Sequence, residues 1–292
     1  MNVECKEASL TEFKKLINFY RTYYEDDNKI FKDGYLDWFL LNNPNGKSKI
    51  ITITLDEVLI SCMFLIPVRF KTLDKVKSGY FVADVLTHQD HRDKNLFVKM
   101  IRYAVEIVKS ESAFIMGHPN RYAIPGWKRT KMKFSSPIRS YLSKPSLINK
   151  ERKVVIETAS QLKEIFNNHE PSCYSIIDPD PDYLSWRFLK HPVNKYKIEA
   201  IYSHEQLLAV EISYKFKVFD RVIHSIMFCN DSSVIFPGIL PKIYHVSDKY
   251  LDSIDKISLF TKPIGSEINC FLTSYDNDIS NIENLGFAGC DN

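Results

Sequence analysis

The sequence lacks any apolar run long enough to span a membrane. The longest run, from Val58 to Val68, is interrupted by a serine, a cysteine and a proline, whereas a spanning helix needs about 20 predominantly apolar residues. Residues 1–6 also carry no apolar signal region. We therefore expect no membrane span and a cytoplasmic protein.

Metal-ligand cysteine pairs and a strong net charge are also missing. The six cysteines stand at positions 5, 62, 173, 229, 270 and 290, and no pair has the close spacing of metal ligands. Cys62 and Cys229 lie in apolar runs, so we interpret the cysteines as small buried side chains in a reducing compartment. The net charge of +3 is too small to argue for nucleic acid.

What is present is the composition of a soluble globular protein. Apolar residues make up 45% of the 292-residue chain and charged residues 26%, which is ordinary for that class. The aromatic fraction of 13% is enough for large cores. The length allows one large domain or two of ordinary size.

The first part of the chain predicts two short helices and a three-stranded antiparallel meander. Ser9-Leu10-Thr11-Glu12 is a capping box that opens a helix reaching Tyr20, and residues 35–40 form a second helix. Strands are expected over residues 50–55, 58–70 and 76–86. The turns at Asp56-Glu57 and 73–75 are short enough to join consecutive strands.

The stretch from Tyr80 to Phe97 carries the clearest functional pattern. Residues 80–87 form an apolar strand, and a polar turn with Arg92 and Lys94 follows it. A helix begins directly afterwards, because apolar residues recur at helical spacing from Leu96 to Val108. Free backbone N–H groups and the positive end of the helix dipole attract anions at such a helix start. The stretch therefore predicts a phosphate site.

The chain then repeats itself at a constant offset. Tyr35, Leu36 and Trp38 recur 148 residues later (183 minus 35) as Tyr183, Leu184 and Trp186. The same meander follows, with strands expected over residues 207–216 and 222–229. Ile257–Pro263 mirrors Phe114–Pro119. We infer an internal duplication.

The two copies differ at the phosphate turn. In the second copy the corresponding segment, residues 230–238, has no Arg or Lys and contains an Asp, which makes a poor phosphate cradle. Asn230 stands where the first copy has Asp84, and an amide cannot act as a base. The sequence thus predicts domains at residues 1–145 and 146–292, with one anion site in the first and a degenerate second domain.

Through residues 5–140 the order of elements resembles the GNAT acyltransferases, which use acyl-coenzyme A (acyl-CoA). The family's loop is Arg/Gln-x-x-Gly-x-Gly/Ala after a strand that hydrogen-bonds the pantetheine arm, and Arg92–Phe97 stand at the matching positions. The resemblance implies an α+β fold of the α/β sandwich type, with two tandem GNAT-like domains. Each domain would be a mixed, mostly antiparallel sheet flanked by helices.

More narrowly, the chain is similar to a GNAT subgroup associated with surface-polysaccharide synthesis. The residues that carry this likeness are Trp38, Asn43-Pro44, Asp84, His91-Arg92, Pro119-Asn120 and Pro125-Gly126-Trp127. The likeness implies a small-molecule amine acceptor, such as a nucleotide-linked or lipid-linked amino sugar.

The resemblance also implies acetyl-CoA or another acyl-CoA as co-substrate, and no metal. The cofactor-binding residues that it implies are Val85, Leu86, Thr87, Arg92, Asp93, Lys94, Asn95, Leu96, Phe97 and Asn120. Arg92 and Lys94 would pair with the pyrophosphate while the amides from Lys94 to Phe97 cradle it. Asn95 replaces the loop glycine and tolerates positive φ better than other residues, and Phe97 is expected to face the core. The alternative is a solvated basic turn.

Three residues are candidates for catalysis. Asp84 lies inside an apolar strand, where burial should raise the pKa of a carboxylate and suit it as a general base toward an amine. The alternative is an Asp that caps a turn or pairs with a cation. Tyr122 or His118, after the next strand, is suited to protonate the CoA thiolate, and Asn120 to hydrogen-bond the pantetheine amide. For His118, Asn120 and Tyr122 the alternative is loop packing.

The leading hypothesis is an acyl-CoA-dependent N-acyltransferase, in which an acceptor amine attacks the thioester directly. Asp84 takes a proton, and amides of the third strand polarise the carbonyl. The second half of the chain would close the acceptor cleft. Two alternatives stay open: a tandem-GNAT transferase that uses aminoacyl-tRNA, which would need a broad basic surface, and a non-catalytic binding protein on a GNAT scaffold.

Overall fold

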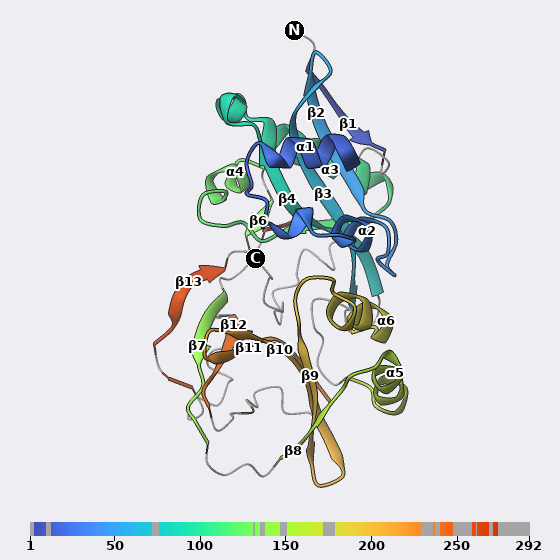
Figure 1. Ribbon diagram of the computed structural model, residues 1–292, viewed down its shortest axis with the longest axis vertical. Helices are drawn as coiled ribbons and strands as arrows, with labels where there is room; N and C mark the ends of the chain where they lie inside the picture. The colour runs from blue at the N-terminus through green and yellow to red at the C-terminus, as the bar shows by residue number, and fades with distance from the viewer. Residues whose placement is uncertain are drawn as a thin grey trace. The chain divides into compact units, whose positions relative to one another are not determined.

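The computed structural model describes residues 3–9, 13–71, 76–130, 132–134, 138–146, 151–171, 179–228, 236, 240–247, 259–260, 262–268 and 271–273. The chain forms two units (Figure 1). Unit 1 contains the described residues within Met1–Arg69, Lys77–Ser135 and Asn269–Ile282, and unit 2 those within Phe70–Val76 and Ser136–Ile268.

Unit 1 is built on a seven-stranded mixed sheet with the order β1-β2-β3-β4-β5-β14-β6. Its strands are β1 (Val3–Ala8), β2 (Lys49–Leu55), β3 (Val58–Lys71), β4 (Val76–Thr87), β5 (Phe114–Gly117), β6 (Lys133–Phe134) and β14 (Phe271–Thr273). β4 and β5 run parallel, whereas β1–β2, β2–β3, β5–β14 and β14–β6 are antiparallel pairs. The predicted turn at Asp56-Glu57 is confirmed, since both residues adopt positive φ, 46° and 70°, as a two-residue hairpin requires.

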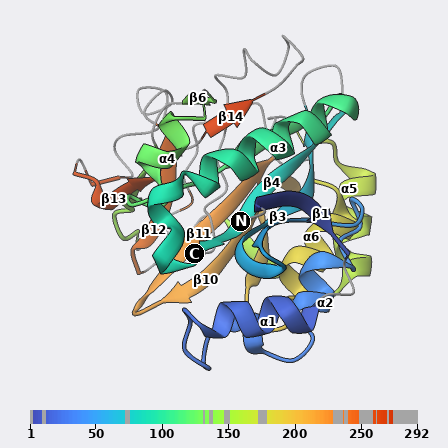
Figure 2. The ribbon, with the colours of Figure 1, turned by 90° about the horizontal axis from the view of Figure 1, so that it is seen from above.

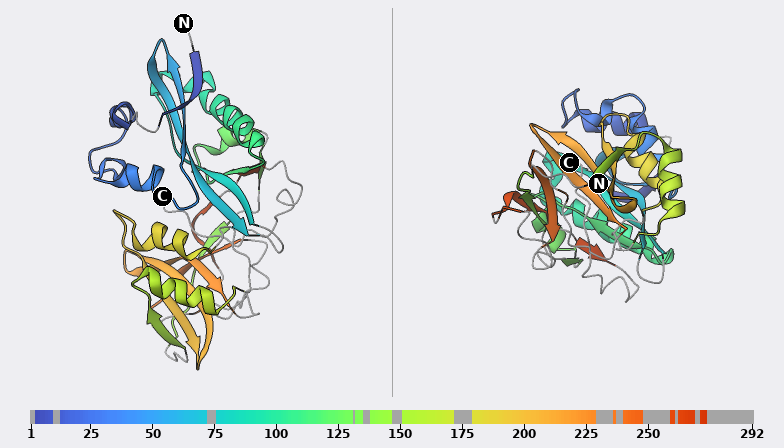
Figure 3. Two further views of the ribbon diagram at one scale, coloured as in Figure 1. Left: turned by 90° about the vertical axis from the view of Figure 1, so that its right-hand side faces the viewer. Right: turned by 90° about the horizontal axis from the view of Figure 1, so that it is seen from below.

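Helices cover both faces of this sheet (Figures 2 and 3). On one face lie α1 (Phe13–Arg21) and α2 (Tyr35–Leu40), and on the other lies α3 (Leu96–Ser110). The short helices are η1 (Lys29–Phe31), η2 (Gln89–Lys94) and α4 (Ile124–Lys128). Because neither face is open to water, the four central residues of β2 are all buried.

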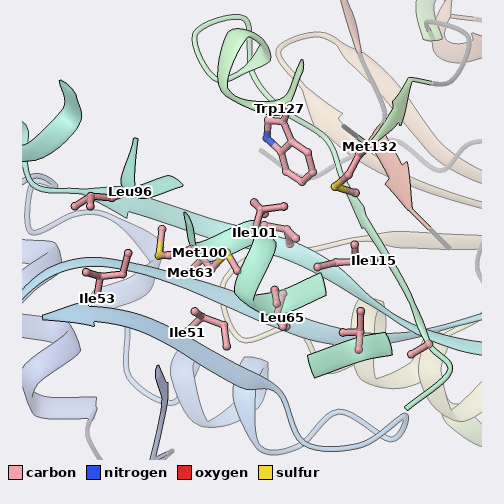
Figure 4. Packing of buried hydrophobic residues seen from close by; sticks show 14 of the residues in the cluster. Ile51, Ile53, Met63, Leu65, Leu96, Met100, Ile101, Ile115, Trp127 and Met132 are labelled. Atoms are coloured by element: carbon pink, nitrogen blue, oxygen red, sulfur yellow. The ribbon is translucent and has the colours of Figure 1, made fainter. Parts of the chain in front are cut away.

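The core beneath α3 is continuous and apolar (Figure 4). Met100 and Ile101 of α3 are fully buried against Met63 of β3 and Ile51 of β2. Trp127 of α4 closes one end, and a Cβ added at Gly117 would lie 2.1 Å from its ring. The end of β5 therefore has no room for a larger residue.

Unit 2 has the same plan, a seven-stranded sheet with the order β13-β7-β12-β11-β10-β9-β8. Its strands are β7 (Ile138–Leu142), β8 (Arg152–Val155), β9 (Lys197–Ser203), β10 (Gln206–Phe216), β11 (Phe219–Met227), β12 (Lys242–Ser247) and β13 (Ile264–Ile268). Its helices are α5 (Ala159–Asn168), α6 (Pro181–Leu184) and the π-helical turn η3 (Ser185–Leu189). α5 begins with a capping box, in which Thr158 and Gln161 bond each other's backbone.

In each sheet one strand lies out of chain order, because it comes from the part of the chain that otherwise forms the other sheet. β7 follows β6 in the chain but lies between β12 and β13 in unit 2. β14, near the end of the chain, lies between β5 and β6 in unit 1. The domain boundary between residues 145 and 146 stays a prediction.

The α+β fold class with two GNAT-like sheets flanked by helices is confirmed. The repeated aromatic pair also has the same geometry in both units: the ring centroids of Tyr35 and Trp38 lie 5.6 Å apart at 44°, and those of Tyr183 and Trp186 lie 5.4 Å apart at 48°. One match was wrong. The strand parallel to β11 is β12, not the 257–263 segment, of which Leu259 forms an isolated bridge to Ser143.

Candidate functional site

The candidate site lies at the end of β4, beyond its last pair with β5. The parallel ladder pairs Gly79 with Phe114 and ends with Val82 opposite Gly117, yet β4 continues to Thr87. Two residues past the last pair, Asp84 adopts a left-handed backbone with φ 44°. β5 itself ends at Gly117, so the last residues of β4 lie beyond the β5 ladder, where their backbone groups can bond an extended ligand.

The end of β4 is fixed to β3 on its other side. The buried hydroxyl of Ser61 donates to the Leu86 carbonyl over 2.9 Å and lies 2.7 Å from the Thr87 hydroxyl. The backbone N–H of His88 donates to the Ile60 carbonyl over 2.9 Å, and Val85 packs against the core beneath α3. The predicted pantetheine residues thus form one anchored segment. Their binding role stays a prediction.

Asp84 is held by a tyrosine from α1. The hydroxyl of Tyr20, which is fully buried, donates to the Asp84 carbonyl over 2.5 Å and accepts from the Cys62 thiol over 3.2 Å. Burial and the Cys62 and Asp84 charges raise the pKa of Tyr20 well above its usual value. Burial and the Asp84 charge raise the pKa of Tyr24 to about 12. The Asp84 charge therefore acts on the hydroxyls of both Tyr20 in α1 and Tyr24 just after it.

The predicted phosphate turn forms the 3-10 helix η2, and its basic residues are exposed. Arg92 folds back on β4, because its Nε donates to the Thr87 carbonyl over 3.3 Å. Its guanidinium carbon lies 5.0 Å from the centre of the Tyr23 ring. Lys94 Nζ lies 2.9 Å from Nδ1 of His91, and Asp93 is exposed beside them.

The start of α3 has the backbone that the sequence predicts. Asn95 is left-handed with φ 54° and ψ 28°, so an asparagine holds the conformation expected of the loop glycine. α3 then begins at Leu96, and the Lys99 N–H makes the first helical bond to the Asn95 carbonyl. The amides before Lys99 point out of the helix start, where an anion is stabilised.

Phe97 faces the core, as expected for a residue that opens a helix. Its ring centre lies 5.4 Å from that of Trp127, and a Cβ added at Gly126 would lie 2.8 Å from the Phe97 ring. Leu96 is buried in the same cluster. The Phe97 side chain is thus directed away from the turn, and its backbone amide remains at the helix start.

The residues after β5 have mostly local contacts. Asn120 Oδ1 accepts from the backbone N–H groups of Tyr122 and Ala123 over 3.0 and 3.1 Å, so its carbonyl oxygen caps a turn. Tyr122 is 77% exposed, and its ring and hydroxyl contact Arg121. For Asn120 and Tyr122 these contacts are those of the loop-packing alternative.

His118 is buried beside β4. Its ring meets that of Phe81 edge-on, with centroids 5.2 Å apart. Burial lowers the pKa of His118 from 6.5 to about 3. His118 is therefore neutral at physiological pH and carries no imidazolium proton to donate.

The described residues contain no group of three or more His, Cys, Asp or Glu side chains that could hold a metal ion. The rings of His88 and His91 lie close together, with centroids 5.8 Å apart. A third histidine, His118, packs against Phe81 and does not extend this pair into a metal-binding cluster. Within the same described ranges, no helix is long and apolar enough to cross a membrane.

The tyrosines in the last turn of α1 and just after it were not singled out by the sequence patterns. Tyr20 bonds Asp84 and Tyr23 contacts Arg92, each across more than sixty residues of chain, and periodicity assigns Tyr20 to an ordinary helix face. The available signal was the run Tyr23-Tyr24 at the helix end, followed by the acidic residues Glu25, Asp26 and Asp27.

Comparison with known proteins identifies the type of domain in the first part of the chain. Residues 4–128 match the family model of the acetyltransferase (GNAT) domain. A search of curated proteins found no match. The domain match supports an enzyme of the acyltransferase class.

Solved structures of the same fold come from several N-acyltransferases. A conserved protein of unknown function from Enterococcus faecalis V583, described as a probable N-acyltransferase, is 13% identical with a TM-score of 0.64 over 92% of this chain and 72% of that chain. A GCN5-related N-acetyltransferase from Kribbella flavida is 8% identical, with a TM-score of 0.64 over 94% and 73%. A tandem GNAT protein from the clavulanic acid biosynthesis pathway is 6% identical, with a TM-score of 0.57 over 94% and 98%. At these identities the likeness shows the fold.

Proposed function

We propose that this chain is an acyl-CoA-dependent N-acyltransferase with its cofactor site at the end of β4 in unit 1. The observation that carries the proposal is the ladder between β4 and β5, which ends at Val82 and Gly117 while β4 runs on to Thr87. An extended pantetheine arm fits the backbone groups of β4 that lie beyond the end of β5, because each amide needs a partner.

The phosphates of the cofactor would lie at the start of α3. Arg92 and Lys94 supply positive charge, and the amides from Lys94 to Phe97 surround the left-handed Asn95. Charge-assisted bonds from Arg and Lys to phosphate are among the stronger hydrogen bonds in proteins. The turn and the helix start therefore act on the same anion.

The reaction would be direct transfer to an amine. The acceptor nitrogen attacks the thioester carbon, the C–S bond breaks, and CoA leaves as a thiolate. Asp84 takes the proton that the nitrogen loses. The thiolate gains one proton to leave as the free thiol, so no net proton is released by the reaction. His118 is neutral and lacks an imidazolium proton, so Tyr122 or water is the better donor to the thiolate.

The acceptor is proposed to be a small molecule with an amine. An amino sugar of surface-polysaccharide synthesis is the class that the sequence resemblance implies, and no described contact selects it. That the second half of the chain completes the acceptor cleft also stays a prediction.

Asp84→Asn tests the catalytic assignment. The variant should retain acetyl-CoA affinity within about twofold and lose turnover by about 100-fold or more, since a general base contributes typically 10²–10⁴-fold. Thermal shift with acetyl-CoA measures binding, and release of free thiol measures turnover. Absence of binding of millimolar acetyl-CoA to the wild-type chain would contradict the acyltransferase proposal. Parallel loss of binding and turnover in Asp84→Asn would make Asp84 structural.

A further inference from the structure

The hairpin turn between β10 and β11 of unit 2 exposes apolar side chains to solvent. Phe216 pairs with Phe219, so Lys217 and Val218 form a two-residue turn. Val218 is 70% exposed, and Phe216 beside it is also exposed. A single exposed apolar residue needs no explanation, so the neighbouring strands decide whether these two belong to a larger patch.

The start of β12 adds a third exposed apolar residue to the same end of the sheet. β12 runs parallel to β11, with Lys242 opposite Asp220. Leu240 stands two residues before Lys242, as Val218 stands two residues before Asp220. Leu240 therefore lies at the level of the turn, and it is 64% exposed.

The end of β7 brings a fourth exposed apolar residue to this end of the sheet. β7 lies beside β12 (Figure 1) and runs antiparallel to it, with Leu142 opposite Ile243. The backbone N–H of Phe260 donates to the Leu142 carbonyl over 2.9 Å, and the Phe260 side chain is exposed. We call these four residues the apolar tip: Phe216, Val218, Leu240 and Phe260.

Lysines accompany the apolar tip on the same segments. The exposed lysines there are Lys144, Lys215, Lys217 and Lys262. One acidic residue, Asp220, occurs among the described residues 142–146, 214–220, 240–243, 259–260 and 262–264. Its carboxylate lies 2.8 Å from Lys215 Nζ. This end of unit 2 therefore combines exposed apolar side chains with an excess of positive charge.

Basic side chains also lie close to the Phe216 ring of the tip. Lys217 Nζ and the guanidinium carbon of Arg221 lie 5.9 Å and 5.6 Å from the ring centre. Long basic side chains cover apolar surface with their stems while the charged head stays in a polar medium. Apolar side chains flanked by Lys and Arg are typical of segments that lie in the headgroup region of a bilayer.

A turn of unit 1 has a similar exposed valine but the opposite charge. Val58 is 65% exposed and follows the turn residues Asp56 and Glu57. Two carboxylates beside a valine are repelled by anionic headgroups, whereas lysines are attracted to them. The two turns therefore provide a comparison between similar apolar exposure with and without positive charge.

We propose that the apolar tip binds the surface of an anionic lipid bilayer. Val218 and Leu240 enter the headgroup region, and the lysines beside them contact lipid phosphates. This peripheral attachment is independent of the proposed acyl transfer. A second copy of the chain is disfavoured as the partner, because a symmetric contact would place the same lysines against each other.

Vesicle binding by the full-length chain is the direct experiment. Flotation is measured with vesicles of phosphatidylcholine alone and with vesicles of equimolar phosphatidylglycerol and phosphatidylcholine. We expect at least about tenfold tighter binding to the phosphatidylglycerol vesicles, because each lysine near an anionic surface contributes about fivefold. High salt should weaken this binding by screening the lysines. Equal binding to both kinds of vesicle, or binding to neither, would overturn the proposal.

Single substitutions separate the apolar and the charged contributions. Val218→Ser should weaken binding to phosphatidylglycerol vesicles about 3- to 10-fold, from the loss of apolar burial. Lys217→Gln should weaken it about fivefold. Val58→Ser and Lys109→Gln are the matched controls in unit 1, since both side chains are exposed there, and each should bind like the wild type. Equal losses in Val218→Ser and Val58→Ser would contradict the assignment.

Sedimentation velocity without lipid tests self-association at the same surface. We expect a monomer, both in the wild type and in Val218→Ser. A dimer that Val218→Ser dissociates would assign the apolar tip to a contact between copies and overturn the membrane proposal. Acetyl-CoA takes no part in these measurements, so failure of the chain to bind it would count against the proposed function alone.

Discussion

The two units share a strand order but differ in the connection between their two central parallel strands. In unit 1 residues 88–113 join β4 to β5 and form η2 and the 15-residue helix α3. In unit 2 only residues 228–241 join β11 to β12, roughly half as many. A segment of that length has no room for a phosphate turn followed by a helix like α3. The comparison therefore favours unit 1 as the cofactor-binding unit.

The units also differ in the chemistry of the equivalent sheet face. Ile51 and Met63 belong to the apolar core beneath α3, and at the 148-residue offset unit 2 has Glu199 and Glu211, both buried. The Glu211 carboxylate lies 2.5 Å from Lys242 Nζ and accepts from the Tyr244 hydroxyl over 2.8 Å. The two units thus share their strand order, while a buried ion pair in unit 2 occupies the position of an apolar core in unit 1.

The Lys242 ammonium is kept charged by this ion pair. Burial alone lowers the pKa of Lys242, but the Glu211 and Glu199 carboxylates outweigh burial and raise it overall. The neighbouring Lys153 has a lowered pKa, because of burial and the Lys242 charge. Replacement of Lys242 would therefore leave a buried negative charge without compensation.

The largest effect is expected from Lys242→Met, which breaks the ion pair of unit 2. The variant should lose about 3–5 kcal/mol of unfolding free energy, the usual cost of removing one partner of a buried pair. The double variant Lys242→Met with Glu211→Met, which copies Met63 of unit 1, should recover most of that loss. Urea denaturation measures both. A single variant as stable as the wild type would contradict the difference drawn between the two interiors.

A proline in the exchanged strand tests how unit 1 depends on β14. Leu272 pairs with Met116 on one side and Lys133 on the other, so Leu272→Pro interrupts the interior of a sheet. A loss of about 3 kcal/mol is expected, of the size that proline costs inside regular structure. Val154→Pro on the edge strand β8 is the control and should cost less. Equal losses in thermal unfolding would show that β14 contributes little to the unit.

The smallest effect is expected at Asn95. Asn95→Gly keeps the left-handed turn and should leave both stability and acetyl-CoA affinity nearly unchanged. Asn95→Ala should cost about 1–2 kcal/mol, because alanine lacks the local hydrogen bonding that helps Asn adopt this conformation. His204, with φ 52° in unit 2, is the matched control: His204→Ala should lower stability without changing acetyl-CoA affinity. Calorimetry decides whether the Asn95 turn contributes to binding.

Local patterns in the sequence predicted α1, α2 and α3, both meanders and the backbone of the phosphate turn. The Thr158–Gln161 capping box, the Asp56-Glu57 turn and the left-handed Asn95 all depend on neighbouring residues, which propensity and spacing describe. The capping box proposed at residues 9–12 and the counterpart turn at residues 230–238 lie mostly outside the described residues. Four of the six cysteines also lie outside them.

The missed features all depend on partners that are distant in the chain. The positions of β7 and β14 follow from pairings such as Phe271 with Gly117, and periodicity does not specify which strands pair. The bend at Asp84 is held by Tyr20 across 64 positions. Burial of Glu211 beside Lys242 was invisible for the same reason, since each charge alone is typical of a surface.

We propose that the chain binds acyl-CoA at one site, at the start of α3 in unit 1. Calorimetric titration of acetyl-CoA into the full-length chain tests it most directly, with Arg92→Gln/Lys94→Gln and the unit 2 control Lys217→Gln alongside. We expect one site per chain, with affinity unchanged in Lys217→Gln. Affinity should be at least about tenfold weaker in the double variant, since each charged hydrogen bond contributes about 1.5–3 kcal/mol. Two sites per chain, or full affinity in the double variant, would contradict it.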